Sequence, residues 1–392
     1  MSWEIYFALS MMMFLEFAVR GTWAPVLSAR LLGPLGMSGK QVGWVYGLVP
    51  LATIVAPLVV GPIVDRWLPT QWVLAGAHLV SGAALFLAAW LSRVPQLLAT
   101  MAVHALCFAP TVALVNSLAF SHLTKPESEF FWVRVWGSIG WVLAGWILAG
   151  WRRWGRQSQR ISDALLLAGV LSLGMAVFCA VCLPHTPPSP GRPPWTTGLE
   201  ILKDPKVLTF LIISFVAATQ LQFYYMGTSR FLEEIGFRTA SIPAIMTVAQ
   251  LAEIVAMAQV LPFVLPKLGY QATLTIGVVL WVLLYAVYLI GRPRWLVVAS
   301  MGLHGFAFAF FLDAAVIYVN RITPEQLRGS AQSLYAAVTL GLGLFVGTQF
   351  TGWVLDRLRK DTGSGYRWRA IFAIPCAVLA LCAIAFVVFF EE

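Results

Sequence analysis

The sequence predicts an all-α membrane protein whose twelve transmembrane helices form two six-helix bundles. The first observation is composition: of 392 residues, 59% are hydrophobic and 11% are charged, and the mean hydropathy is +0.81. The second is that apolar runs long enough to cross about 30 Å of hydrocarbon recur along the whole chain. The third is a proline-rich polar segment in the middle. Because backbone groups in lipid must be hydrogen-bonded within their own segment, the apolar runs are expected to be helices.

Six apolar runs precede the central segment. We expect helices near residues 5–28, 41–63, 71–92, 97–120, 130–151 and 163–184. The first run, MSWEIYFALSMMMFLEF, lacks a positively charged start and a cleavage site of small residues. We therefore interpret it as a retained span rather than a signal peptide.

The central segment separates two domains. It contains HTPPSPGRPPW, whose prolines prevent a continuous helix. We accordingly predict an N-terminal bundle over residues 1–184, a loop over 185–206 and a C-terminal bundle over 207–392. In the second half, helices are expected near residues 207–228, 241–264, 270–291, 295–320, 328–351 and 370–390.

A weak repeat relates the fourth predicted span to the tenth. The first of these has His104, Phe108 and Ala109, and the second has His304, Phe308 and Ala309 at the same spacing. Three matches in a biased composition are a small signal, but they fall where a six-helix duplication would place them. Transporters built from such duplications bind their substrate between the halves, near the middle of the membrane.

Several other classes of function find little support. The net charge of +9 is spread over loops such as RRWGRQSQR, which is typical of membrane-flanking anchors rather than of nucleic-acid binding. Cys179 and Cys182 form a CxxC inside an apolar run, where we interpret them as packing residues rather than a metal or redox pair. HExxH and GxSxG motifs are missing, so we expect no enzyme, no metal and no cofactor.

Five ionisable residues nevertheless fall inside predicted spans: Glu16, Arg20, Arg134, Glu253 and Asp313. Each costs about 2.5–3.5 kcal/mol at a helix centre, so we expect them to face one another or a polar cavity. Glu16 and Arg20 are four residues apart and can form a structural ion pair on one helix face. With three acids against two arginines, one acid lacks a partner, and burial favours its protonated form. Glu253 or Asp313 is therefore the candidate proton carrier.

Three helix faces combine side chains suited to a polar ligand with a flat ring. Arg134, Ser138 and Trp141 share a face of the fifth predicted span; the alternative is that Arg134 braces a loop or reaches the membrane surface. Gln222 and Tyr225 share a face of the seventh span, as do Gln250 and Glu253 in the eighth. For any one of these residues, a buried structural hydrogen bond explains its presence about as well as contact with a ligand.

Longer motifs give these residues a family context. GPIVDRW places Gly61, Asp65 and Arg66 in the GxxxDR arrangement of the major facilitator superfamily, and GWVLDR at 352–357 has the same form. VRVWGSIGW, LQFYYMGTSRFL, VAQLAEI and HGFAFAFF followed by LRGSAQSLY, in that order, resemble the bacterial nucleoside:proton symporter family of this superfamily. The resemblance covers nearly the whole chain, from the first span to the eleventh.

The resemblance implies twelve helices in two bundles that move nucleosides into bacteria and use the proton gradient. It further implies a multi-pass protein of the bacterial inner membrane with cytoplasmic termini, and we expect a monomer in the lipid bilayer. The nucleoside-binding or coupling positions of the family fall on Arg134, Ser138, Trp141, Gln222, Gln250 and Glu253. Gly61, Asp65 and Arg66 correspond to its conformational loop motif.

Three features depart from the family. Tyr225 stands where asparagine is common, which puts substrate choice in question. Ala309 stands where the family has an acid, and Asp313 follows four residues later, about 6 Å along the helix; if it does not compensate, the protein is a facilitator without proton coupling. Lysine and arginine are also more numerous in the segments that cytoplasmic termini would place outside, against the usual bias.

The functional prediction is a nucleoside transporter that works by alternating access and is coupled to protons. The alternative within this class is a transporter of another small polar solute. From other classes, the alternatives are a membrane sensor that binds without flux and an intramembrane enzyme that alters its ligand. The sequence offers neither a soluble signalling domain nor a catalytic constellation for them.

Overall fold

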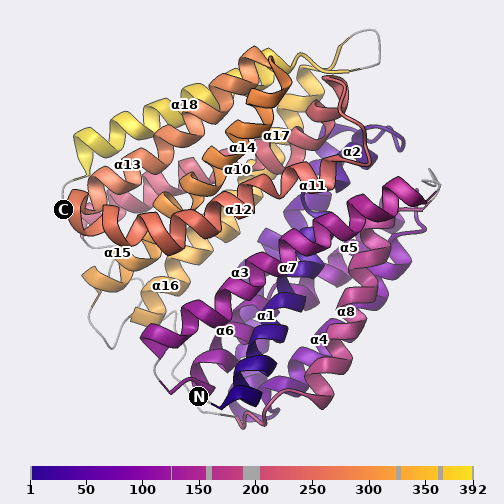
Figure 1. Ribbon diagram of the computed structural model, residues 1–392, viewed down its shortest axis with the longest axis vertical. Helices are drawn as coiled ribbons and strands as arrows, with labels where there is room; N and C mark the ends of the chain where they lie inside the picture. Colours follow the sequence, from indigo (N-terminus) through magenta and orange to yellow (C-terminus); the bar gives the residue numbers. More distant parts are fainter. Residues whose placement is uncertain are drawn as a thin grey trace. The chain divides into compact units, whose positions relative to one another are not determined.

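The computed structural model describes residues 2–124, 126–155, 161–188, 204–323, 328–360 and 365–390 (Figure 1). Regular secondary structure in these ranges is helical, and a single isolated β-bridge joins Arg359 to Tyr366. The predicted all-α class is therefore confirmed.

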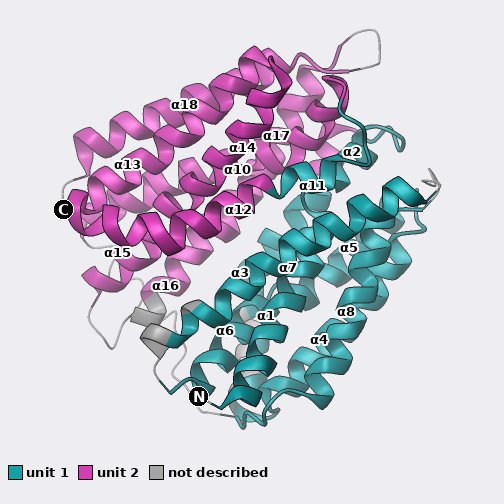
Figure 2. Ribbon diagram, viewed as in Figure 1, with its two compact units in different colours: residues 1–37, 44–191, 237–247 teal, residues 38–43, 192–236, 248–392 magenta. Residues whose placement is uncertain are grey.

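The chain forms two compact units (Figure 2). Unit 1 contains residues 1–37, 44–191 and 237–247, and unit 2 contains 38–43, 192–236 and 248–392. Two short segments, 38–43 and 237–247, thus group with the opposite half of the sequence. Most of the predicted central loop, 189–203, lies outside the described residues, and the predicted domain boundaries stay a prediction.

Unit 1 is built from helices of the first half together with one short helix from the second. Its helices are α1 (Trp3–Trp23), α2 (Leu27–Leu32), α3 (Gly39–Arg66, from residue 44 onward), α4 (Thr70–Ala88), α5 (Val94–Phe108), α6 (Thr111–His122), α7 (Pro126–Trp154), α8 (Asp163–Val181) and α11 (Ile242–Met246). Arg152 near the end of α7 binds Asp163 at the start of α8 through two hydrogen bonds of 2.6 and 2.7 Å. This bidentate pair fixes the connection between the two helices.

Small residues allow the helices of unit 1 to approach closely. A Cβ added at Gly82 of α4 would lie 2.9 Å from the backbone of Leu173 in α8, and one at Gly169 of α8 would lie 2.9 Å from the backbone of Phe86. Such contacts are typical of helix packing in membranes, where lipid is as apolar as the side chains and close packing supplies the attraction. Leu9, Met12, Leu74, Val115, Leu118 and Met175 are buried in the core between α1, α4, α6 and α8.

Unit 2 differs from unit 1 in having three described π-helical turns. Its elements are α10 (Pro205–Glu234), α12 (Val248–Val255), η2 (Ala256–Val260), α13 (Leu261–Ile290), α14 (Arg294–Phe308), η3 (Ala309–Asp313), α15 (Ala314–Ile322), α16 (Arg328–Ala336), η5 (Ala337–Gly343), α17 (Leu344–Arg357) and α18 (Trp368–Phe389). The turns η2, η3 and η5 each widen an otherwise α-helical segment, and π-turns of this kind are frequent at functional sites.

The core of unit 2 is rich in aromatic rings. Phe231 of α10 and Phe372 of α18 have ring centroids 5.1 Å apart, and Tyr285 of α13 stacks on Phe372 at 5.9 Å. All three side chains are buried. Edge-to-face and stacked pairs of this kind add to the stabilisation from burial alone.

Ten described helical stretches are long and apolar enough to cross a membrane. Their positions match the predicted spans, with the stretch Ile242–Ile290 covering both 241–264 and 270–291. Gly269 interrupts this stretch with φ 76° and ψ 177°, a conformation that glycine adopts readily. The predicted span at 41–63 corresponds to α3, which is not among the ten. The protein is therefore a multi-pass integral membrane protein.

Candidate functional site

In unit 1, the predicted binding residues lie on α7 where it packs against α1. A Cβ at Gly21 of α1 would lie 2.7 Å from the indole ring of Trp141, so the glycine makes room for this side chain. The Arg134 guanidinium lies 4.0 Å from the centroid of the Phe17 ring, a cation–π contact with α1. Trp141 is buried, and its indole N–H has no hydrogen-bond partner among the described residues. Arg134 and Ser138 are half-buried.

In unit 2, the first pair of predicted residues lies on α10. Gln222 is buried, with 4% of its surface exposed, although an amide normally seeks water. Tyr225 is half-buried, and its ring stands edge-on to the imidazole of His304 in α14, with centroids 6.0 Å apart. His304 in turn stacks on Tyr224 at 3.8 Å. The imidazole therefore supports the part of α10 that carries the predicted pair.

The second pair lies on α12, which packs closely on α14. A Cβ at Gly305 would lie 2.5 Å from the backbone nitrogen of Glu253, and closer still to the carbonyl oxygen of Ala249. Gln250 is buried, and its side-chain oxygen accepts no hydrogen bond from the described residues. Glu253 is half-buried. The amide oxygen of Gln250 is thus an acceptor that a ligand can use.

Asp313 lies at the end of the π-turn η3, which begins at Ala309. Ala309 stands where the resemblance implies an acid, and Asp313 follows it by four residues. These residues form a π-turn rather than an α-helical turn. Ala309 is fully buried and Asp313 is half-buried. The Asp313 carboxyl lies within electrostatic reach of the Tyr335 hydroxyl of α16.

The weak repeat found in the sequence has a structural counterpart. His104 and His304 are both buried, and each is hydrogen-bonded at Nδ1: the first by Ser81 Oγ at 2.8 Å, the second by Trp281 Nε1–H at 3.1 Å. The α-helix ends just after each histidine, at Phe108 in unit 1 and at Phe308 in unit 2. Interrupted helices at corresponding positions of two halves are a pointer to the binding site of a transporter.

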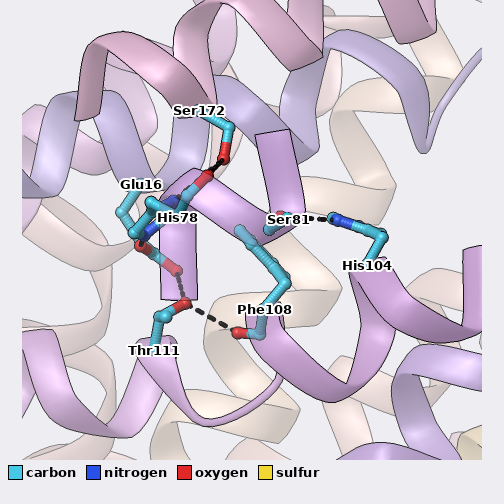
Figure 3. Close-up of polar contacts among 7 residues, drawn as sticks. All are labelled: Glu16, His78, Ser81, His104, Phe108, Thr111 and Ser172. Carbon is cyan, nitrogen blue, oxygen red and sulfur yellow. Dashed lines mark hydrogen bonds and ion pairs between the residues drawn. The ribbon is translucent and has the colours of Figure 1, made fainter. Parts of the chain in front are cut away.

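A buried polar network surrounds Glu16 in unit 1 (Figure 3). Glu16 Oε2 lies 2.8 Å from His78 Nε2, and Thr111 donates to Glu16 Oε1 at 2.8 Å. On the far side of the imidazole, His78 Nδ1 lies 3.1 Å from Ser172 Oγ. Glu16 is 1% exposed, and the other three residues are fully buried. Four helices, α1, α4, α6 and α8, thus contribute one side chain each.

The positions of His78, Thr111 and Ser172 around Glu16 were not predicted from the sequence. The predicted partner of Glu16 was Arg20, and that ion pair stays a prediction. Arg20 is half-buried and within electrostatic reach of His104. A signal was available, since an acid at mid-span requires partners and a histidine is among the few residues that can supply one. Nothing in the spacing identified which histidine this would be.

The two GxxxDR-like stretches lie at the ends of α3 and α17. Arg66 ends α3 and is exposed, while the burial of Gly61 and the side chain of Asp65 lie outside the described part of the structure. In the second stretch, the Asp356 carboxylate accepts hydrogen bonds from the backbone N–H groups of Gly39 at 2.5 Å and Lys40 at 2.9 Å. Asp356 therefore caps the N-terminus of α3 within unit 2.

Metal ligation has no candidate in the described ranges, because no three His, Cys, Asp or Glu side chains there are placed to hold an ion. All five cysteines are free, including Cys179 and Cys182. The chemistry available at the predicted positions is therefore hydrogen bonding, ring stacking and proton transfer.

Comparison with known proteins gives consistent matches over the full chain. Residues 3–392 match the family model described as Nucleoside H+ symporter. A putative nucleoside transporter of Escherichia coli, YegT, is 30% identical over 98% of this chain and 93% of its own. The nucleoside permease NupG of the same organism is 26% identical over 98% and 95%. A crystal structure of the nucleoside transporter NupG superposes with a TM-score of 0.89 and 25% identity, covering 99% of this chain and all of that one.

Proposed function

Because this chain belongs to the Nucleoside H+ symporter family, we propose that it moves nucleosides and protons together across the bacterial inner membrane by alternating access. The match of the family model to residues 3–392 carries this proposal, since it includes every predicted site residue. The relatives named above are transporters, which supports transport rather than catalysis.

We further propose that twelve helices span the bilayer, with both termini in the cytoplasm, and that the protein works as a monomer. The ten apolar stretches supply eleven of these spans, since Ile242–Ile290 is long enough for two. α3, with 28 residues, supplies the remaining one. The excess of lysine and arginine in the segments then placed outside makes orientation the first feature to test.

The predicted polar residues would recognise the nucleoside. Trp141 and Tyr225 offer rings for stacking on the base. Gln222 and Gln250 would bind base edges or ribose hydroxyls, because an amide presents both donors and an acceptor. Their burial in apolar helices supports this role, since a buried amide costs free energy unless it is hydrogen-bonded. Ser138 and Arg134 would add a hydroxyl and a cation on α7.

Glu253 and Asp313 would respond to protons in unit 2. A half-buried acid in a membrane helix is costly when ionised, so its protonation depends on the surrounding conformation. For coupling, the proton affinity of such an acid has to differ between the conformations that face the two sides of the membrane. The π-turn η3 gives Asp313 a backbone that is already distorted from the α-helix.

Uptake of labelled uridine and adenosine into liposomes holding the purified protein tests this function. Accumulation above equilibrium that requires an inward proton gradient is the expected result. Equilibration without accumulation would mean a facilitator, and an unlabelled panel of sugars and other polar solutes would test the alternative substrates by competition. Substitution of both Glu253→Gln and Asp313→Asn is expected to weaken the effect of the gradient; unchanged gradient-driven uptake would contradict the role assigned to these acids.

A further inference from the structure

We propose that the Glu16–His78 pair in unit 1 is a proton-carrying site of this transporter. The proposal rests on the proton-coupled function above and assigns it a site that the sequence did not predict. Glu16 Oε2 and His78 Nε2 are 2.8 Å apart, and both side chains are buried. A carboxyl and an imidazole at this distance share a hydrogen bond, so a proton gained or lost by one changes the charge beside the other.

The Ser172 hydroxyl lies between two possible hydrogen-bond partners. Its oxygen lies 3.1 Å from His78 Nδ1 and 3.0 Å from the backbone carbonyl oxygen of His78. A hydroxyl has one proton and can also accept. When Ser172 donates to Nδ1, the imidazole is neutral and its Nε2–H donates to Glu16. When Ser172 instead donates to the carbonyl, its oxygen accepts from Nδ1–H, and His78 carries both protons.

The Thr111 hydroxyl likewise lies between two possible acceptors, Glu16 and a backbone carbonyl. Its oxygen lies 2.8 Å from Glu16 Oε1 and 2.6 Å from the carbonyl oxygen of Phe108. When Thr111 donates to Oε1, Glu16 is a carboxylate. When Thr111 donates to the carbonyl, its oxygen accepts from a protonated Oε1–H. Figure 3 shows these alternative acceptors on either side of the Glu16–His78 pair.

Each hydroxyl can therefore keep its hydrogen bond by rotating when its partner gains or loses a proton. The pair carries a net charge of about −1 when His78 is neutral and Glu16 is ionised, zero when His78 gains a proton, and +1 when Glu16 gains one as well. The hydrogen bonds of both titratable groups are kept in all three states. The Thr111 contact with the Phe108 carbonyl is of a kind common in helices, whereas the second acceptor of Ser172 lies on another helix, α4.

Other charged or titratable groups lie on the helices packed around the pair. The nearest are in electrostatic reach of its members: Cys179 of α8 interacts with Glu16, and His104 of α5 interacts with both His78 and Arg20 of α1. Farther along neighbouring helices are Arg134 of α7 and His122 at the end of α6.

The decisive experiment compares two transport modes in proteoliposomes. With one proton per nucleoside, an inward gradient of about one pH unit supports up to about tenfold accumulation of uridine. We expect Glu16→Gln to reduce accumulation to about onefold while still exchanging labelled for unlabelled uridine at equal pH. His185→Gln is the control, since it removes a histidine of the same unit whose ring is hydrogen-bonded to the Gln71 side chain at 2.8 Å and does not contact a carboxylate in any described hydrogen bond. It is expected to keep gradient-driven accumulation.

Two conservative variants test the hydroxyls and do not remove a titratable group. Ser172→Ala deletes the acceptor for Nδ1–H of the charged imidazole, so the pH of half-maximal accumulation is expected to move by about one unit toward acid. Thr111→Val deletes the donor to the Glu16 carboxylate, so the same midpoint is expected to move by about one unit toward alkali. A structural role alone would lower activity without shifting the midpoint in opposite directions.

The outcomes separate this proposal from the proposed function. If the unsubstituted protein does not accumulate nucleosides under a gradient, the coupled function itself is wrong. If it does, and Glu16→Gln accumulates equally well, the Glu16–His78 site is wrong. If Glu16→Gln does not fold, the two hydroxyl variants decide: unmoved midpoints, or midpoints that move in the same direction, would overturn the proposal.

Discussion

The close contact between α12 and α14 leads to a sharp prediction for Gly305→Ala. The added Cβ would lie 2.5 Å from the Glu253 backbone nitrogen, whereas ordinary van der Waals contact begins at 3.4 Å. The Ala249 carbonyl oxygen would lie closer still, so the two helices must separate by more than about 0.9 Å, because both obstructing atoms belong to the backbone and cannot rotate away. Overpacking of this kind costs about 1–3 kcal/mol.

The same displacement moves Gln250 and Glu253, which α12 carries. A misplacement of about 1 Å can reduce a rate by roughly 100-fold when it affects groups that position a substrate. We expect Gly305→Ala to lower the thermal unfolding temperature of the purified protein and to reduce nucleoside uptake by one to two orders of magnitude. Uptake kinetics in proteoliposomes and a thermal melt in detergent measure the two effects.

Gly302→Ala on the same helix is the matched control. Its Cβ would meet a single neighbour, Ala252 Cβ at 3.6 Å, which is an ordinary contact. Since alanine favours a helix over glycine by about 0.5–1 kcal/mol, this variant is expected to be as stable as the unsubstituted protein or slightly more so. Equal melting temperatures and equal uptake for the two variants would refute the reasoning from backbone contact.

Two further predictions concern contacts described above. Phe17→Leu removes the ring beneath Arg134 and with it a cation–π interaction of about 0.5–2 kcal/mol, so the KM for uridine uptake is expected to rise severalfold. Phe17→Tyr keeps the ring and serves as the control. An unchanged KM in Phe17→Leu would argue against the contact. Asp356→Asn removes the charge that caps α3 at Gly39 and is expected to destabilise the protein by about 0.3–1 kcal/mol, measured as a lower melting temperature. Asp356→Ala should lose more, because no acceptor remains, and equal losses for the two variants would contradict the capping role.

Hydropathy was sufficient to predict where the helices lie, because each membrane span must satisfy its own backbone and so has a minimum apolar length. It also identified the break between the spans near 241–264 and 270–291, where Gly269 departs from helical geometry. The π-turns could not be predicted in this way. AFFLD of η3 is as apolar as its neighbours, and the choice between an α-turn and a π-turn depends on packing against other helices.

The sequence also could not predict which side chains on different helices contact one another. The faces carrying Arg134 with Ser138 and Gln250 with Glu253 follow from helical spacing, because residues three or four apart lie on the same side. His78 is 62 residues from Glu16, and Ser172 is 94 residues from His78. No local period connects residues so far apart, and only the packing of α1, α4 and α8 brings them into contact.

The break between α5 and α6 has a mechanical consequence. Phe108 is the last residue of α5, and Thr111 is the first of α6. The Thr111 hydroxyl and one of its two acceptors, the Phe108 carbonyl, therefore lie on opposite sides of the break. Bending at this break changes the distance from Thr111 to Glu16 relative to its distance from the Phe108 carbonyl. A change in the bend of this one membrane span would therefore change the hydrogen bond that Thr111 makes to Glu16. In the proposed site, a small bending motion inside unit 1 would thus favour one protonation state of Glu16 over the other.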